Sequence, residues 1–228
     1  MQEYLSQVVA KKYLAKDIVE LSVKPVKPRA IKFRAGQFVF FRIGDAWKAY
    51  SIASPPADRH RLKFCIKLEP GGKGSEFIKN LKSGDPLEFS GPEGFFYASG
   101  LRGDYYFLAS GIGVAPFASI IPDLLAKKFA GRAVLIHRDR SENGLPYAGL
   151  FRNLAAKNPA FRYVPISKKH QNLTDCLAGL GINLPKSWFY VCGGKEAVDG
   201  ISQALLKMGV PEERIRTETF LYSDRRAV

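Results

Sequence analysis

A glycine-rich turn in the middle of the chain is the first feature that could do chemistry. Residues Ser110 to Pro116 read Ser-Gly-Ile-Gly-Val-Ala-Pro and stand between a strand-like apolar run and a helix-like run. Glycines let the backbone approach a pyrophosphate closely, and the free N–H groups at a helix start favour its negative charge. Proline suits the first helical turn, where its missing N–H costs nothing. We therefore predict a nucleotide-binding turn made by Gly111, Gly113, Val114, Ala115 and Pro116.

A tight turn that needs small residues for packing is the alternative explanation of these glycines. It would suffice for a lone glycine pair. Two glycines on either side of Ile112, followed directly by Ala115 and Pro116, are harder to explain in that way. The third glycine of the common dinucleotide fingerprint is missing, so the sequence predicts a nucleotide turn of another type.

Two further short signatures flank the turn. Lys48-Ala49-Tyr50-Ser51 lies near the front of the chain, and Val191-Cys192-Gly193-Gly194 lies near its end. Tyr50 offers a flat, polar-tipped ring that can stack on an isoalloxazine, and Ser51 can donate a hydrogen bond toward the flavin N5. Alone, a Tyr-Ser pair is more often structural, and a buried cysteine is usually a small hydrophobic residue. Together, the order of the three signatures predicts a flavin in the first half and a nicotinamide nucleotide in the second.

The elements that must position these signatures change character near residue 100. Before it, short alternating or aromatic runs between Pro and Gly turns predict a small antiparallel barrel, interrupted by one helix with Ser75 as its N-cap. After it, strands alternate with helices, which builds a parallel, helix-covered sheet. We predict a two-domain fold, with a β-barrel at 1–100 and an α/β domain at 101–228. The expected strands are 6–9, 18–23, 38–43, 49–53, 62–68, 87–90, 105–109, 133–137, 161–165 and 188–192, and the expected helices are 75–81, 115–129, 147–156 and 195–208.

Composition limits the class of protein. At 228 residues, with 46% hydrophobic and 25% charged residues, the chain can bury a sizeable core and is not expected to be disordered. Its three cysteines lack the paired spacing of a zinc or iron–sulfur site, so we expect no metal. The start lacks the layout of a signal peptide, and no apolar run reaches the roughly 18 residues of a membrane span. We therefore expect a cytoplasmic protein, and we expect it to be a monomer.

The charge of the chain favours an anionic partner. A formal net charge of +14 comes from 35 Lys and Arg against 21 Asp and Glu, and the phosphates of nucleotide cofactors account for only part of it. For any single basic cluster, a solvated surface is an equally good explanation. The aromatic and basic interleaving of an RNA-binding sheet is not seen, so we expect no nucleic acid partner.

The motifs together resemble those of the ferredoxin-NADP reductase family. The turn at Gly111 to Pro116 resembles that family's G-x-G-x-A-P loop, and Lys48 to Ser51 resembles its R-x-Y-S/T flavin motif with Lys in place of Arg. The resemblance spans nearly the whole chain and implies a six-stranded antiparallel barrel that binds FAD, then a five-stranded parallel sheet that binds NAD(P)H. The other matching pieces, in family order, are Ala35-Gly36-Gln37-Phe38, Gly72-Lys73-Gly74-Ser75, Gly91-Pro92-Glu93-Gly94-Phe95-Phe96 and Val191-Cys192-Gly193-Gly194.

The resemblance also implies roles for individual residues. Lys48 would supply charge to the flavin phosphates without the planar fork of Arg. Ser51, Cys192 and Glu218 would be catalytic, with Cys192 near the nicotinamide and Glu218 helping to relay protons. An aromatic residue, either Phe220 or Tyr222, would cover the flavin. The remaining expected cofactor contacts are Ala49, Tyr50, Ile66, Lys67, Leu68, Gly72, Lys73, Gly74, Ser75, Gly193 and Gly194.

Basic residues after two of the expected strands bear on the choice of nucleotide. Arg138 and Arg140 follow one strand, and Ser167 and Lys168 follow the next. The resemblance implies that these residues gather around the adenine ribose, where a cation reads the 2'-phosphate of NADP. Exposed loop charges are the alternative. We predict NADPH as the cofactor, with NADH as the other choice.

The function implied by the resemblance is that of an FAD-dependent NAD(P)H oxidoreductase. Hydride would pass from the nicotinamide to the flavin, and electrons would leave to a separate acceptor, because the sequence holds no iron–sulfur or haem domain. An acidic ferredoxin or flavodoxin is favoured. An NAD(P)H:flavin reductase and an oxygenase reductase component remain open, as does a redox-sensing subunit that binds nucleotide without turnover.

Overall fold

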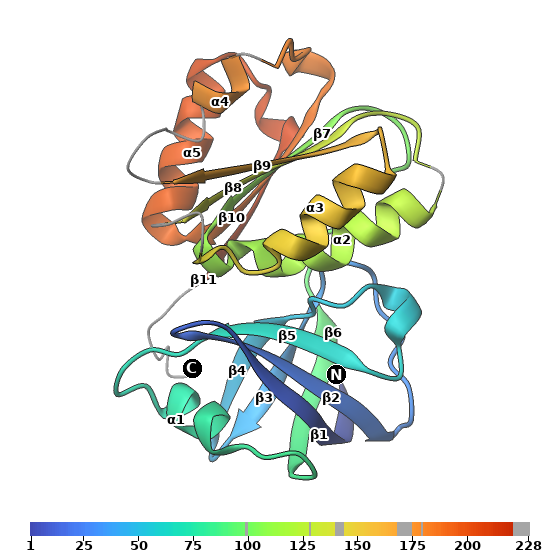
Figure 1. Ribbon diagram of the computed structural model, residues 1–228, viewed down its shortest axis with the longest axis vertical. Coiled ribbons are helices and arrows are strands. Elements are labelled where there is room, and N and C mark those ends of the chain that lie inside the picture. Colours follow the sequence, from blue (N-terminus) through green and yellow to red (C-terminus); the bar gives the residue numbers. More distant parts are fainter. Residues whose placement is uncertain (99, 128, 140–143, 168–174, 179, 221–228) are drawn as a thin grey trace. The chain divides into compact units, whose positions relative to one another are not determined.

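The computed structural model describes residues 1–98, 100–127, 129–139, 144–167, 175–178 and 180–220 (Figure 1). The chain divides into two compact units. The first unit consists of Met1–Ala98 together with Ala115–Asp123, and the second takes the described residues of Ser99–Val114 and Leu124–Arg226.

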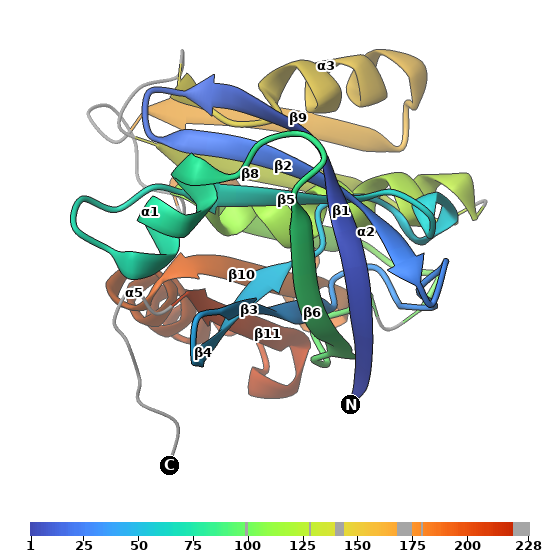
Figure 2. The same cartoon turned by 90° about the horizontal axis from the view of Figure 1, so that it is seen from below.

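The first unit is built on six antiparallel strands, β1 to β6. They pair in the order β4-β3-β6-β1-β2-β5, and a bridge between Ile52, just after β4, and Phe64 of β5 joins the two ends. The sheet thereby closes into a barrel, which Figure 2 shows from below. This confirms the predicted antiparallel barrel. The strands are β1 (Gln2–Ala15), β2 (Ile18–Lys27), β3 (Phe38–Ile43), β4 (Ala46–Ser51), β5 (Leu62–Lys67) and β6 (Pro86–Glu93).

The barrel core follows from the two-residue period of its strands. Alternate residues of a strand face the same side, and in β3 these are the buried Val39, Phe41 and Ile43. The ring of Phe41 lies 4.7 Å from that of Phe64 and 4.6 Å from that of Tyr50. The core therefore supports β4, the strand that carries the predicted flavin motif.

Helix α1 (Lys73–Asn80) begins two residues before the predicted helix. Its N-cap is Gly72, and the Ser75 hydroxyl instead accepts a hydrogen bond from the backbone N–H of Glu69 at 2.7 Å. The prediction of Ser75 as the N-cap is therefore wrong. The physical reason is that the buried Ser75 side chain holds the turn that precedes the helix.

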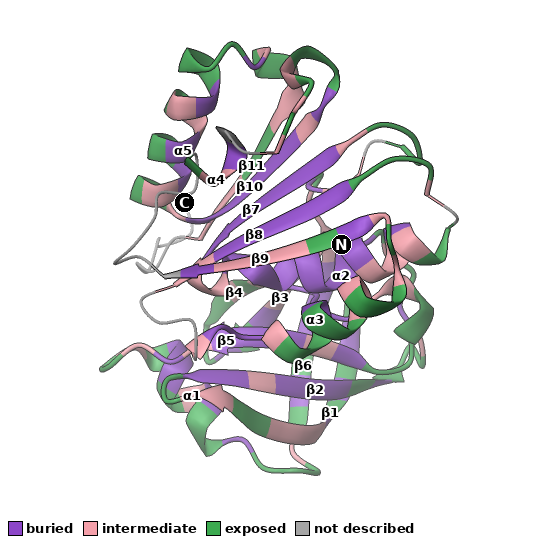
Figure 3. Ribbon diagram, turned by 45° about the horizontal axis from the view of Figure 1, so that its top comes forward, coloured by how far each residue is buried: buried purple, intermediate pink, exposed green. Residues whose placement is uncertain are grey.

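The second unit is built on five parallel strands in the order β11-β10-β7-β8-β9. Every residue of β7 is buried, and Figure 3 shows this strand in purple along its length. Continuous burial is typical of a parallel strand covered on both faces. The strands are β7 (Tyr105–Ser110), β8 (Ala133–Asp139), β9 (Phe161–Ser167), β10 (Trp188–Gly194) and β11 (Ile215–Phe220).

Helices connect the strands in the pattern that a parallel sheet requires. Among the described segments, α5 packs against β10 and β11, and α3 packs against β9. A 3-10 turn, Gly111–Val114, leads from β7 into α2, and Pro116 lies in the first turn of that helix as predicted. The helices are α2 (Ala115–Ala126), α3 (Ala148–Lys157), α4 (Asp175–Ala178) and α5 (Lys195–Lys207), with further 3-10 turns at Pro56–Asp58, Leu184–Lys186 and Glu212–Arg214.

The two-sheet architecture confirms the predicted fold class, while several element bounds differ. β1 runs to Ala15 because it pairs with β2 as far as Ile18. The prediction ended it at residue 9 because Ala10, Lys11 and Lys12 do not continue the apolar alternation. Strand β11 was not among the predicted strands. No helix among the described residues is long and apolar enough to cross a membrane.

Candidate cofactor-binding sites

The predicted flavin motif lies on β4 of the first unit. Ser51 is buried at the end of the strand, and Lys48 and Tyr50 are half-buried. Burial raises the pKa of the Tyr50 hydroxyl to about 12, so the phenol keeps its proton at neutral pH. Tyr50 can therefore donate a hydrogen bond as well as offer a ring for stacking.

The start of α1 lies against the same motif. A Cβ placed on Gly74 would lie 3.1 Å from Cδ of Lys48 and 3.2 Å from the hydroxyl oxygen of Tyr50. A side chain at position 74 would require Lys48 and Tyr50 to shift by a few tenths of an ångström, so glycine favours the close approach of α1 to these groups. The structure thus brings together two predicted sets, Lys48 to Ser51 and Gly72 to Ser75, with the early N–H groups of a helix beside a lysine and a tyrosine.

The third predicted flavin segment lies at the end of β5. The side chains of Ile66 and Leu68 belong to the barrel core, and that of Lys67 forms an ion pair with Glu69 at 2.6 Å. The backbone N–H of Leu68 donates to the carbonyl of Asp17 at 2.7 Å. Any contact of Ile66 or Leu68 with a cofactor would therefore have to use backbone groups, and their assignment stays a prediction.

In the second unit, the nucleotide turn packs against the end of β10. A Cβ on Gly113 would fall 2.1 Å from the carbonyl oxygen of Cys192, and a Cβ on Gly193 would fall 3.0 Å from Cβ of Ser110. Glycine is needed at position 113, where a Cβ would overlap backbone atoms, and it favours the close approach of Gly193 to Ser110. Two predicted signatures that are far apart in the sequence therefore form one surface in the fold.

Strand register gathers the other predicted residues of this unit at the same edge. Arg138 pairs with Ser110, and Glu218 and Phe220 of β11 pair with Cys192 and Gly194. Carboxyl ends of parallel strands are where open α/β sheets bind ligands. The Nε atom of Arg138 is buried without a hydrogen-bond partner among the described residues, so it retains a donor for a ligand.

Cys192 is fully buried at this edge. Burial, and to a smaller degree the charge of Glu218, raise the pKa of its thiol well above 9. The thiol therefore stays protonated at neutral pH and acts as a neutral, polarisable contact group. It is not poised as a thiolate nucleophile.

His137 is a residue of this edge to which sequence reasoning gave no role. It is fully buried on β8, and burial lowers the pKa of its imidazole to about 4, against the weaker raising effect of its bond to the Gly111 carbonyl. The sequence places a histidine at the end of an apolar strand and directly before Arg-Asp-Arg, which could have marked it as a site residue. The sequence does not show that this histidine bonds to Gly111.

Some predicted residues cannot be placed. Arg140, Lys168 and Tyr222 lie outside the described residues, and Ser167 is the last residue of β9. Phe220, the alternative to Tyr222, is half-buried at the end of β11.

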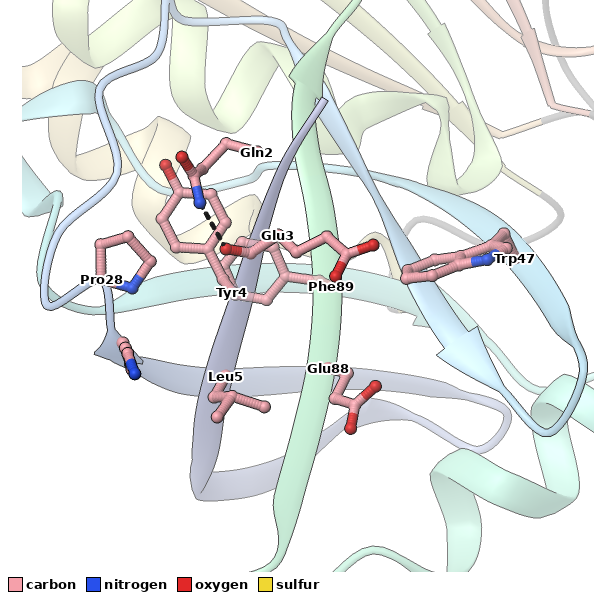
Figure 4. A pocket seen from close by; sticks show the side chains of 9 residues that line it. Gln2, Glu3, Tyr4, Leu5, Pro28, Trp47, Glu88 and Phe89 are labelled. Carbon is pink, nitrogen blue, oxygen red and sulfur yellow. Dashed lines mark hydrogen bonds between the residues drawn. The ribbon is translucent and has the colours of Figure 1, made fainter.

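A pocket of about 330 Å³ lies elsewhere on the first unit (Figure 4). Its floor includes the stacked rings of Tyr4 and Phe89, 4.8 Å apart, and its rim includes the exposed Leu5 and Trp47. None of the predicted cofactor contacts lines it. It is therefore distinct from the sites described above.

Comparison with known proteins identifies the family. The model of the oxidoreductase FAD-binding domain matches residues 6–97. Over 235 residues the chain is 31% identical to the reductase component DmpP of phenol 2-monooxygenase from Pseudomonas sp. (strain CF600), across 96% of this chain and 66% of that protein. The chain belongs to the ferredoxin-NADP reductase family. It is also 25% identical to ferredoxin-NADP reductase B from Sorangium cellulosum, across 96% of this chain and 98% of that one.

Several solved structures share the fold of this chain. The chain superposes on the Amycolatopsis cytochrome P450 reductase GcoB with a TM-score of 0.87 at 23% identity, across 96% of this chain and 70% of that one. For a ferredoxin NADP+ reductase from Neisseria gonorrhoeae with bound FAD and NADP, the TM-score is 0.81 at 22% identity. That match covers 96% of this chain and 99% of the other chain. The chain spans 66% of the phenol 2-monooxygenase component. It spans 56% of a 3-ketosteroid-9-alpha-monooxygenase ferredoxin reductase component from Rhodococcus rhodochrous.

Proposed function

We propose that this protein is an FAD-dependent NAD(P)H oxidoreductase that passes electrons to a separate acceptor. The observation that carries the proposal is the pair of glycine-lined helix starts, one in each unit: Gly74 beside Lys48 and Tyr50, and Gly113 beside Cys192. In this proposal residues 1–100 bind FAD and residues 101–228 bind the nicotinamide nucleotide. Membership in the family supports the same assignment of the two cofactors.

The first unit fits a flavin dinucleotide. Gly74 keeps the start of α1 open beside Lys48, so backbone N–H groups and an ammonium group can meet the same diphosphate. Tyr50, two residues further along β4, would stack on the ring, and the Ser51 hydroxyl would donate toward it. Lys73 is exposed in the first turn of α1 and adds a second positive charge.

The second unit fits a nicotinamide dinucleotide. The N–H groups of the Gly111–Val114 turn would meet its diphosphate, and the orphaned Nε donor of Arg138 would reach its adenine half. Arg138, with Arg140 and Lys168 as further candidates, supports a preference for NADPH over NADH. Comparing the two specificity constants tests that preference, and a preference for NADH would contradict it.

A bound flavin supplies the link between two-electron hydride chemistry and one-electron transfer. The protein's residues position and shield the reactants. Ser51 would hold the flavin edge by a hydrogen bond, and the protonated Cys192 thiol would contact the nicotinamide without reacting with it. Glu218, paired with Cys192 in register, would hold or release a proton at its carboxylate. The proposal assigns to Phe220 or Tyr222 the aromatic ring that would cover a flavin face.

An acidic electron-transfer protein, a ferredoxin or a flavodoxin, is the acceptor that the charges favour. Segments 24–34 and 59–61 of the first unit carry seven Lys and Arg and no Asp or Glu. The two segments are tied together, because Ile31 N–H donates to the Arg59 carbonyl at 3.1 Å and His60 bonds the Arg29 carbonyl at 3.0 Å. We call this surface the basic loop pair.

The cations of the basic loop pair are available to a partner. Arg29, Lys32, Arg59 and Arg61 are exposed, and none of them forms an ion pair with another residue that the structure describes. A surface of one sign attracts a partner of the opposite sign over long range and speeds encounter. This arrangement favours an acidic protein acceptor over a neutral small molecule.

A reductase component of an oxygenase is the second candidate. The phenol 2-monooxygenase and 3-ketosteroid-9-alpha-monooxygenase components are among the relatives that match most of this chain. In that case the acceptor would be an oxygenase protein or its ferredoxin. The site residues would keep the roles given above.

The deciding experiment is a spectrum of the purified protein, followed by addition of NADPH or NADH. We expect a yellow protein that releases FAD on extraction and bleaches with the nucleotide. A protein that releases only FMN contradicts the FAD site. A protein that reduces added flavin without retaining any favours a flavin reductase, and a colourless protein without turnover favours a nucleotide-binding regulatory subunit.

A further inference from the structure

His137 makes two hydrogen bonds at the back of the nucleotide turn. Its Nε2 atom lies 3.1 Å from the carbonyl oxygen of Gly111, and its Nδ1 atom lies 3.3 Å from the hydroxyl oxygen of Tyr163 on β9. A carbonyl oxygen can only accept, so Nε2 must carry the proton. The neutral ring then accepts at Nδ1, and Tyr163 donates to it. The two bonds select one tautomer of His137.

Gly111 is the point at which the turn can most easily change its conformation. Its φ is +59°, and no atom lies within 4 Å of the place where a Cβ would stand. Because glycine has no Cβ, rotation of the peptide between Gly111 and Ile112 meets less steric resistance at this residue than it would at a residue with a side chain. In a trans peptide the carbonyl oxygen and the following N–H point in opposite directions, so such a rotation would reverse both.

A bond to the Gly111 oxygen consequently fixes the direction of the Ile112 N–H. That N–H is among the first of the helical turn, which are the groups without partners inside the helix. His137 reaches the oxygen from β8, where it pairs with Ala109 in the register of the sheet. His137 thus gives the 3-10 turn an additional bond from the rigid core of the second unit.

We propose that His137, oriented by Tyr163, is a positioning residue for nucleotide binding, which holds the Gly111–Ile112 peptide so that the turn is preorganised for a diphosphate. The inference rests on the proposed function, since it takes NAD(P)H as the ligand of the turn. His137 touches protein groups and acts through the turn. It therefore sets the affinity for the nucleotide and leaves the chemical step unchanged.

Four variants test the inference. His137→Leu removes both hydrogen bonds, whereas His137→Gln keeps an amide donor within reach of the Gly111 oxygen. Tyr163→Phe removes only the hydroxyl that orients the ring. Tyr106→Phe, at the opposite end of the sheet on β7, is the matched control for losing a buried hydroxyl. Binding of NADP+ to each FAD-loaded protein is measured by calorimetry, together with thermal unfolding.

We expect the Leu variant to bind NADP+ about tenfold more weakly and Tyr163→Phe about threefold more weakly, since tenfold corresponds to the loss of about one net hydrogen bond. His137→Gln and Tyr106→Phe should stay within about twofold of wild type. In steady state, the KM for NADPH should rise in proportion while kcat at saturation is unchanged. The amount of bound FAD should not change.

Unchanged NADP+ affinity in both His137→Leu and Tyr163→Phe overturns the inference. So does an equal loss of affinity and thermal stability in the Gln and Leu variants, because that would make His137 a core residue only. If the Leu variant fails to fold, the contrast between Tyr163→Phe and Tyr106→Phe decides by the same criteria. A wild-type protein that binds neither NADP+ nor NAD+ overturns the proposed function itself, and the inference with it.

Discussion

The carbonyl oxygen of Cys192 lies so close to Gly113 that a Cβ on Gly113 would fall only 2.1 Å from it. The contact joins the end of β10 to the turn that follows β7, and it involves backbone atoms on both sides. Backbone atoms cannot swing aside as a flexible side chain can. The two segments can therefore meet only if residue 113 is glycine.

Replacing Gly113 by alanine should consequently distort the nucleotide turn. We expect Gly113→Ala to lower the free energy of unfolding by about 2 kcal/mol, as overpacking in a close contact does, and to abolish measurable NADP+ binding. The measurements are denaturant unfolding and calorimetry. Gly200→Ala is the matched control, because it lies in α5 with nothing within 4 Å of its Cβ, and it should stabilise the protein by about 0.5–1 kcal/mol. Equal behaviour of the two variants would contradict the packing argument.

Burial of His137 should make the protein sensitive to acid. The pKa of His137 is lowered to about 4, whereas in the unfolded chain it is near the ordinary 6.5. As the pH falls below 6.5, the unfolded chain takes up a proton that the native state refuses, so stability declines until the pH reaches about 4. The full difference corresponds to about 3 kcal/mol.

Unfolding by denaturant between pH 7 and pH 4.5 measures this effect. The variant His137→Gln should lose most of the pH dependence. The control His60→Gln replaces an exposed histidine and should keep it. A wild-type profile that is flat in this range would show that His137 is not held neutral.

Much of this molecule was predictable from patterns, and the remainder depended on contacts that patterns do not encode. The strand at Phe38–Ile43 was predicted with its correct bounds, because a short, aromatic-rich apolar run between Gly36 and Gly44 is typical of a strand. Strand β11 was missed because its burial is only partial and it lies at the edge of the sheet. Ser75 was predicted as the N-cap because capping residues precede a helical pattern of apolar residues. Its hydroxyl instead accepts a hydrogen bond from the backbone N–H of Glu69.

In the candidate sites, too, some features were predictable from the sequence and others depended on contacts between elements. The sequence identified the glycines, but the structure gives a different reason for each. The backbone of Cys192 excludes a Cβ at Gly113, the side chains of Lys48 and Tyr50 lie close to Gly74, and Gly111 has a φ of +59°. The role of His137 could not be read from the sequence, since its partner Gly111 lies on another element. Local periodicity predicts elements, whereas bonds between elements appear only in the fold.

Lysine at position 48 should bind FAD less tightly than an arginine would. Lys48→Arg would offer a planar, two-pronged donor to a diphosphate, and we expect FAD to bind more tightly than to wild type. Lys48→Ala should weaken FAD binding about tenfold, the effect of losing one charge-assisted hydrogen bond. Lys12→Ala, which removes an exposed lysine of β1, is the control for the change in net charge. Titration of the apoprotein with FAD measures all three, and weaker binding in Lys48→Arg would contradict the prediction.

Ser51 and Cys192 should affect hydride transfer more than nucleotide binding. We expect Ser51→Ala and Cys192→Ala each to slow flavin reduction by NADPH at least tenfold, because positioned groups of this kind act mainly on the transition state. Cys176→Ala, on α4 in the same unit, is the matched control and should leave the rate unchanged. Stopped-flow bleaching of the flavin measures the rate. Unchanged bleaching in both variants would refute the assignment.

The basic loop pair should make electron transfer to an acidic partner depend on salt. Attraction between surface charges is screened beyond about 10 Å at 0.1 M salt, so reduction of an acidic ferredoxin or flavodoxin should slow steeply as salt is added. Reduction of a small neutral quinone should barely change. The triple variant R29Q/R59Q/R61Q should lose most of the salt dependence, whereas K12Q/K16Q/K207Q, which removes as many exposed cations elsewhere, should keep it. Equal salt responses for the protein and quinone acceptors would show that these cations only solvate the surface, and would favour a small-molecule flavin reductase.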